Sequence, residues 1–204
     1  MAHRRPPLVR ALALNTAVLV PELLGGVRGN SLSLVMDGVH NVSDEIALAM
    51  LVVAYTIRAG LSGNALRIAN LFDSAGLLAI SGFLVWHALE RLGHPPGIVG
   101  GVPLVIGLLA AAGNWGVARA LRDASREDPA IRLAYVHNLG DTLVSLAPAV
   151  AGALTLLTGR SIFDPILALV VAVAIIVPSA QALFALGGTL VWPESVRCAH
   201  DVRT

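Results

Sequence analysis

The fold is decided by the stretch Val39-His40-Asn41-Val42-Ser43-Asp44, which sets a histidine and an aspartate four residues apart inside a long apolar run. A second stretch, Val136-His137-Asn138-Leu139-Gly140-Asp141, begins 97 positions later and matches the first at four of its six positions. Residues four apart on a helix share one face, with Cβ atoms about 5–6 Å apart. Each stretch therefore presents an imidazole and a carboxylate on the same side of a helix.

The apolar surroundings of these residues predict one buried site that both stretches share. Insertion scales assign about 2.5–3.5 kcal/mol to an ionised side chain at the centre of a spanning helix, so the two aspartates alone would cost roughly 5–7 kcal/mol. A helix that faces lipid would not carry them. Two such helices facing each other supply four nitrogen and oxygen ligands, the number that tetrahedral zinc takes at roughly 2.0–2.2 Å. We therefore predict a metal site formed by His40, Asp44, His137 and Asp141.

Length and composition predict an all-α membrane protein with a single bundle. The chain has 204 residues, is 56% hydrophobic and has a mean hydropathy of +0.77. A spanning helix needs about 20 apolar residues, so six helices and their loops fill nearly the whole chain. We expect short tails at 1–7 and 188–204, and a six-helix transport domain at 8–187 with helices at about 8–27, 31–55, 68–89, 97–118, 131–157 and 164–187. The first apolar run is longer than the hydrophobic region of a signal peptide, so we expect it to be retained.

The distribution of charge predicts the orientation. All fourteen basic residues are arginine and the formal net charge is +1, without the like-charge runs that bind nucleic acid. Eleven arginines fall on the side of the two predicted tails and three on the other, which places both termini in the cytoplasm. The two His/Asp stretches lie in the second and fifth helices, which run in opposite directions. This is the arrangement of a 3+3 inverted repeat with its site near the bilayer midplane.

Other polar residues lie close to the predicted site. Asp37 comes three residues before His40 on nearly the same face, so it is a candidate for a carboxylate at the mouth of the site, an outer partner of an imidazole, or a solvated helix end. Asn41 and Asn138 follow the two histidines and point about a quarter-turn away, which favours packing or outer hydrogen bonds over ligation. The alternative for the whole cluster is a set of interhelical hydrogen bonds that only fix the packing. Further intramembrane polar groups should face the bundle interior, because lipid exposure would be costly: Asn15, Glu22 and Asn114.

The order of these elements resembles the cation diffusion facilitator family. The resemblance covers about residues 8–195 and includes Asn15, Glu22 and Gly25, the run from Ser31 to His40 leading into Asp44, His137 with Asp141, and Asp164-Pro165-Ile166. It implies that the four motif positions form the transport site for a divalent cation exchanged for protons, and histidine in both motifs resembles the zinc-transporting branch. Family members usually continue into a cytoplasmic metal-binding domain that supports dimerisation, whereas twelve residues follow Trp192 here. We therefore expect the transmembrane unit alone, with at most a weak homodimer.

The function we expect is secondary transport and not enzymatic catalysis. The chain would export Zn²⁺ across a bacterial inner membrane in exchange for protons, because metal binding needs neutral imidazoles and ionised carboxylates, and histidine has an unperturbed pKa of about 6.5. Two nitrogens and two oxygens favour zinc over magnesium or calcium and leave Cd²⁺, Co²⁺ and Fe²⁺ open. Two other readings remain: a membrane-embedded zinc hydrolase using the same cluster, and a haem-binding electron carrier with His40 and His137 as axial ligands, which would leave both aspartates unexplained.

Overall fold

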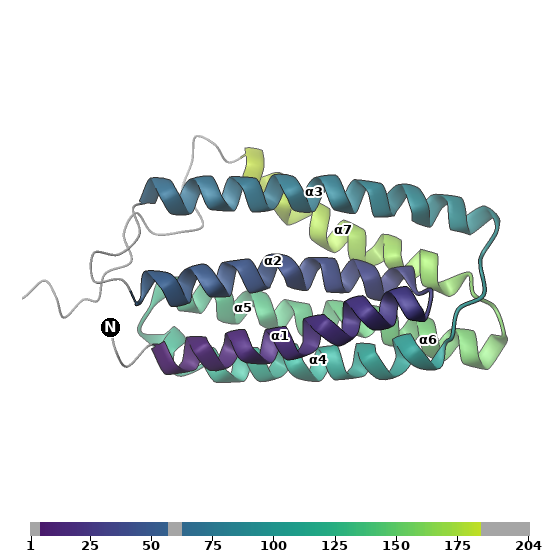
Figure 1. Cartoon of the computed structure of the whole chain (residues 1–204), viewed down its shortest axis with the longest axis horizontal. Helices are drawn as coiled ribbons and strands as arrows, with labels where there is room; N and C mark the ends of the chain where they lie inside the picture. Colours follow the sequence, from purple (N-terminus) through teal and green to yellow (C-terminus); the bar gives the residue numbers. More distant parts are fainter. Residues whose placement is uncertain (1–4, 57–62, 185–204) are drawn as a thin grey trace, which may run out of the picture.

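Helices are the secondary structure of the described part of the chain, as predicted. The computed structural model describes residues 5–56 and 63–184, and no strand occurs in these two ranges (Figure 1). Residues 1–4, 57–62 and 185–204 lie outside these ranges. Most of the two predicted tails is therefore outside the described residues, and so is position 187, where we predicted the end of the last helix. The elements are α1 (Arg5–Arg28), α2 (Leu32–Ala54), α3 (Gly63–Gly93), α4 (Gly101–Leu121), the 3-10 turn η2 (Ala124–Arg126), α5 (Pro129–Val144), α6 (Leu146–Thr158) and α7 (Phe163–Phe184).

Five segments of the described chain are long and apolar enough to cross a membrane. They are α1, residues 74–93 of α3, α4, residues 130–158 through α5 and α6, and residues 163–181 of α7. α2 has 23 residues, a similar length, but carries three acidic side chains, Asp37, Asp44 and Glu45. Lipid contact would be costly for these groups. α2 instead lies in the middle of the bundle, in contact with α1, α3 and α7 (Figure 1).

The structure divides the segment for which we predicted one helix at 131–157. α5 ends at Val144 and α6 begins at Leu146, with Ser145 between them. The cause is Pro148, which has no N–H to donate to the carbonyl of Val144 and whose ring clashes with that carbonyl in a regular helix. The amide of Ser145 still bonds to the carbonyl of Asp141, at 2.8 Å. The break therefore lies one turn beyond the second motif.

A buried carboxylate of α7 holds the N-terminus of α2. Asp164 accepts hydrogen bonds from the hydroxyls of Ser31 and Ser33, both at 2.6 Å, from the amide of Leu32 at 2.6 Å and from the amide of Ser33 at 3.3 Å. A carboxylate at this position satisfies free N–H groups and complements the positive end of the helix. In the sequence, Asp164 was noted only as part of the stretch Asp164-Pro165-Ile166. In the structure it also fixes α2 to α7.

The opposite end of α2 is tied to α5. Asp128 precedes α5 and accepts from the amides of Ala130 and Ile131, at 2.9 and 3.3 Å, as an N-cap does. The same carboxylate accepts a hydrogen bond from the hydroxyl of Tyr55, at the C-terminal end of α2. The start of α5 therefore meets the end of α2, and the two helices that carry the motifs run antiparallel.

Two apolar clusters pack on either side of the motif in α2. One joins α1, α2, α4 and α5, and the other joins α2, α3 and α7. Along α2 the motif lies between Met36, which belongs to the second cluster, and Leu48, which belongs to the first. The polar residues are thus enclosed between two hydrophobic layers, which limit access of water along the helix axis.

Candidate metal centre

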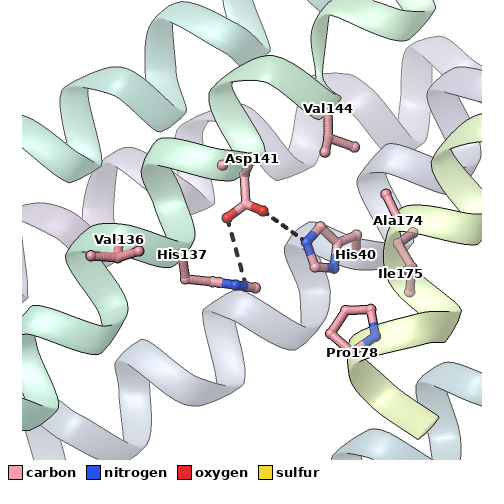
Figure 2. A pocket seen from close by; sticks show the side chains of 9 residues that line it. His40, Val136, His137, Asp141, Val144, Ala174, Ile175 and Pro178 are labelled. Atoms are coloured by element: carbon pink, nitrogen blue, oxygen red, sulfur yellow. Dashed lines mark hydrogen bonds and ion pairs between the residues drawn. The ribbon is translucent and has the colours of Figure 1, made fainter. Parts of the chain in front are cut away.

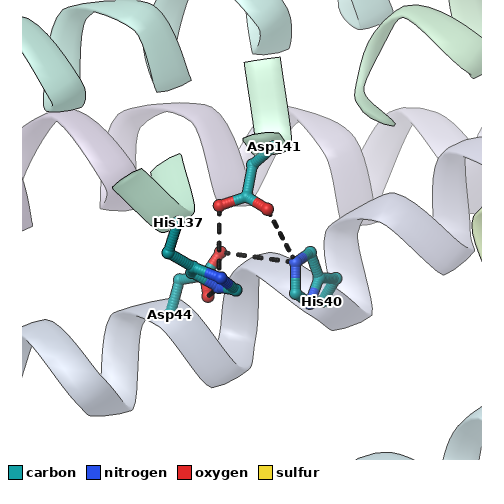
Figure 3. A group of neighbouring side chains, drawn as sticks. All are labelled: His40, Asp44, His137 and Asp141. Atoms are coloured by element: carbon teal, nitrogen blue, oxygen red, sulfur yellow. Dashed lines mark hydrogen bonds and ion pairs between the residues drawn. The ribbon is translucent and has the colours of Figure 1, made fainter. Parts of the chain in front are cut away.

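α2 and α5 bring the four predicted site residues, His40, Asp44, His137 and Asp141, into one cluster (Figure 3). One donor atom from each residue lies within 4.8 Å of the other three. The hydrogen bonds cross between the helices: Nε2 of His40 is 3.0 Å from Oδ1 of Asp141, and Nε2 of His137 is 2.8 Å from Oδ1 of Asp44. The two imidazole rings meet edge to face, with centroids 5.4 Å apart. The repeated motif therefore forms one site and not two.

The spacing of the donors suits a tetrahedral cation. Within each helix, Nε2 of the histidine lies 4.0 Å from Oδ2 of Asp44 in α2 and 3.6 Å from Oδ2 of Asp141 in α5. Zinc with bonds of about 2.0–2.1 Å in a tetrahedron needs donors about 3.3–3.4 Å apart. The four separations between a histidine nitrogen and an aspartate oxygen, from 2.8 to 4.0 Å, lie on both sides of that value. Small side-chain movements would convert the cross-paired cluster into a four-ligand cage.

Access to the cluster is open on one side. His40, Asp44 and Asp141 are buried, but 45% of the His137 side chain is exposed. A pocket of about 290 Å³ lies beside it, with His40, His137 and Asp141 on one wall (Figure 2). The opposite wall comes from α7 and is formed by Ala174, Ile175 and Pro178. His137 is thus the member of the cluster that a solute in the pocket meets first.

The three neighbouring polar residues are not part of the cluster. Asp37 is 1% exposed and neither of its carboxylate oxygens accepts a hydrogen bond, so the solvated helix end considered above does not apply. Asn41 donates to Oε2 of Glu22 at 2.6 Å, and Asn138 donates to the carbonyl of Ala134 at 2.9 Å. These bonds hold α2 against α1 and stiffen α5. Neither asparagine is hydrogen-bonded to the four clustered residues.

Sequence reasoning placed the interior polar groups correctly but missed the far wall of the pocket. Asn15, Glu22 and Asn114 are fully buried, as the cost of lipid exposure predicted. The residues of α7 that line the pocket are apolar, apart from their backbone, and resemble the lipid-facing residues around them. Pro178, inside α7, is the one signal in that helix that could have marked the segment.

Comparison with known proteins identifies the family. The family model described as the cation efflux transmembrane domain matches residues 8–190 of this chain. The Bacillus subtilis protein named "Cadmium, cobalt and zinc/H(+)-K(+) antiporter" is 26% identical over 179 residues, which are 83% of this chain and 58% of the relative. The zinc transporter ZitB of Yersinia pestis is 31% identical over 178 residues, 83% of this chain and 57% of the relative.

A third relative is the metal cation efflux system protein CzcD of Cupriavidus metallidurans, 27% identical over 170 residues that make up 79% of this chain and 54% of the relative. The chain thus spans little more than half the length of these relatives. Their names are those of transporters and antiporters, in agreement with the prediction that this chain is not an enzyme, and all three are bacterial, in agreement with an inner-membrane location. Because the family model covers nearly the whole chain and several of its helices are long and apolar enough to span a bilayer, this is a multi-pass integral membrane protein of the cation efflux family, the cation diffusion facilitators.

Proposed function

We propose that this chain exports divalent metal cations, Zn²⁺ foremost, from the cytoplasm in exchange for protons. The observation that carries the proposal is the cluster of His40, Asp44, His137 and Asp141, whose donor atoms gather within 4.8 Å between two antiparallel helices. Two imidazole nitrogens and two carboxylate oxygens suit zinc, cadmium and cobalt better than magnesium or calcium. The names of the relatives, which mention zinc, cadmium, cobalt and protons, support the same choice.

The cross-paired cluster suggests how the cation and protons exclude each other. In the hydrogen bonds between His40 and Asp141 and between His137 and Asp44, a ring nitrogen and a carboxylate oxygen share a proton. A cation that binds these atoms must displace the protons between them, because ligands must be deprotonated. One set of atoms thus serves both ions. Their alternate occupation from the two sides of the membrane would couple the two fluxes.

The pocket between α5 and α7 is the proposed route to the cluster. A cation in the pocket would first exchange a water molecule for Nε2 of the half-exposed His137 and then reach Asp141, which also lines the pocket. His40 and Asp44, both buried, would complete the coordination from α2. The ties at Asp164 and at Asp128 keep α2 in place while the cation enters.

The finer architecture that goes with this function is also a proposal. The four residues 40, 44, 137 and 141 are its metal ligands, and residues 8–187 form a six-helix transport domain with a 3+3 inverted repeat centred on α2 and α5. The antiparallel course of these helices, seen where Tyr55 meets Asp128, supports the repeat. The excess of arginine on one side supports cytoplasmic termini. Any homodimer would be weak and would form through membrane faces in the bilayer.

Flux measurements in proteoliposomes test the proposal. Vesicles that contain only this chain, with an imposed pH gradient, should accumulate Zn²⁺ and Cd²⁺ on the acidic side and lose the gradient as they do so. Vesicles with the Asp44→Ala variant should do neither. If the unaltered chain moved no metal, or moved it at the same rate with and without the gradient, the proposed exchange would be wrong.

A further inference from the structure

Two buried carboxyl groups next to the cluster have no part in the function described so far. Glu22 of α1 is 0% exposed and Asp37 of α2 is 1% exposed. Three of their four oxygens, Oε1 of Glu22 and both oxygens of Asp37, accept no hydrogen bond. The fourth, Oε2 of Glu22, accepts from Asn41 at 2.6 Å. Buried carboxylate oxygens without a hydrogen-bond donor are unusual and need a physical explanation.

The two carboxyl groups lie against each other. Glu22 faces the side of α2 that carries Asp37, because Asn41, one helical turn after Asp37, donates to Oε2 of Glu22 at 2.6 Å. Close approach of α1 and α2 makes this contact geometrically possible, since a Cβ atom at Gly38 would lie 3.2 Å from Cβ of Glu22. Ser145, at the break between α5 and α6, is near enough to act on Asp37 but completes no hydrogen bond to it.

Within the described residues, no arginine forms an ion pair with either carboxyl group, and the sequence contains no lysine. The charged or titratable groups that face the pair are His40 and Asp44 on α2 and Asp141 on α5. The pair is not joined to any of these three by a hydrogen bond or an ion pair. Their own hydrogen bonds are made within the cluster.

Two adjacent ionised carboxylates cannot persist in a buried site of low polarity without a cation. A single proton removes the difficulty. It converts one carboxyl group into a donor, and its O–H then satisfies an oxygen of the other, so that the pair carries one negative charge instead of two. The unpartnered oxygens of Glu22 and Asp37 are those between which such a proton would be held.

We propose that Glu22 and Asp37 form a proton-binding site, separate from the metal centre, whose proton is one of those exchanged for the cation. This inference rests on the proposed function. Asp37 precedes His40 by one helical turn, and Asn41, which binds Glu22, directly follows His40, so the pair adjoins the cluster along α2. A divalent cation in the cluster adds positive charge beside the pair and favours its fully ionised form. The shared proton then leaves to bulk water, and a proton returns when the cation departs.

Proton release on metal binding tests this inference. The purified chain is titrated with Zn²⁺ in a weakly buffered solution, and the protons released per bound ion are counted with a pH indicator. Glu22→Gln and Asp37→Asn replace either acid with an amide of the same shape, which donates a hydrogen bond to the remaining carboxylate. Each variant should bind Zn²⁺ and release about one proton fewer than the unaltered chain.

Glu45→Gln is the matched control. Glu45 also joins α2 to α1, but its oxygens already accept from Asn15 at 2.9 Å and from Thr16 at 2.5 Å, so it has no need of a proton and its variant should release as many as the unaltered chain. A second measurement does not depend on how the variants fold. The infrared band of protonated carboxyl groups in the unaltered chain should weaken when Zn²⁺ is added. Proton release unchanged in both amide variants, or an infrared band that does not respond to Zn²⁺, would overturn the inference. Absence of Zn²⁺ flux in the unaltered chain would instead contradict the proposed function.

Discussion

Nε2 of His137 and Oδ1 of Asp44 lie 2.8 Å apart, although 93 residues separate them in the sequence and they belong to different helices. The same is true of His40 and Asp141, at 3.0 Å. Each imidazole thus bonds across to the other helix in preference to the aspartate four residues along its own. Removal of one side chain leaves its partner on the opposite helix without its hydrogen bond, which makes the four residues interdependent.

Loss of either aspartate should abolish transport. We expect Asp44→Ala and Asp141→Ala to weaken zinc binding at least about 100-fold, because each removes a proposed ligand, and even loss of a partner behind a ligand costs 10–100-fold. Isothermal titration of the purified variants measures the affinity, and vesicle uptake measures transport. Glu90→Ala, which alters a largely exposed carboxylate of α3, serves as the control and should behave like the unaltered chain. Normal zinc flux in either aspartate variant would refute the shared site.

Exchange of a histidine for an aspartate should change the selectivity. His40→Asp and His137→Asp each keep a ligand but replace a nitrogen with a harder oxygen, which favours Mn²⁺ and Fe²⁺ relative to Zn²⁺. Competition between these metals for uptake into vesicles measures the effect. If both variants kept the original order of preference, the choice of metal would have to be made outside these four residues.

The carboxylate of Asp164 should contribute to stability. Asp164→Asn removes the negative charge and turns an amide N–H towards groups that are themselves donors, the hydroxyls of Ser31 and Ser33 and the amide of Leu32. A hydrogen bond to a charged group is worth about 1.5–3 kcal/mol, so we expect a clear fall in the thermal unfolding temperature in detergent. Asp123→Asn, at an exposed position, should leave that temperature unchanged. Equal unfolding temperatures for the two variants would mean that the four hydrogen bonds to Asp164 do not stabilise the fold.

The tie between α2 and α5 should have a smaller effect. Tyr55→Phe deletes the hydroxyl that donates to Asp128, while Asp128 keeps its bonds to the amides at the start of α5. We expect a loss of about 0.5–1.5 kcal/mol in the free energy of unfolding, the usual net value of one hydrogen bond. Asp128→Ala removes the cap as well and should cost more. Denaturation in mixed detergent compares the two variants, and a larger loss for Tyr55→Phe than for Asp128→Ala would be the contrary result.

The sequence was sufficient for the parts of this structure that depend on local periodicity. The spacing of His40 and Asp44, repeated at His137 and Asp141, predicted four side chains in one place, because i and i+4 share a face on any helix. It could not predict which imidazole bonds to which carboxylate. That choice depends on the rotation and offset of α2 against α5, which arise from packing far from the motif.

Other features could not be predicted from the sequence, because they do not depend on the periodic spacing of residues. The break at Ser145 follows from Pro148, but the apolar pattern continues through it, so residues 131–157 read as one helix. The burial of Asp37 depends on how closely α1 approaches α2, and the sequence left it between a solvated end and an interior position. The role of Asp164 could not be predicted, because its bonds to the N-terminus of α2 join residues more than 130 positions apart.

The break at Ser145 gives the second motif a joint. In an unbroken helix, any tilt of residues 146–158 would be transmitted rigidly to Asp141, and the cluster would be distorted with it. Here Pro148 leaves the carbonyl of Val144 without its helical hydrogen bond, so α5 and α6 are coupled less tightly than two turns of one regular helix. Since Asp141 is only one turn away, a few degrees at this joint alter its distance from Asp44 on the other helix. A change in the bend of this single helix would therefore move one aspartate of the cluster relative to the other.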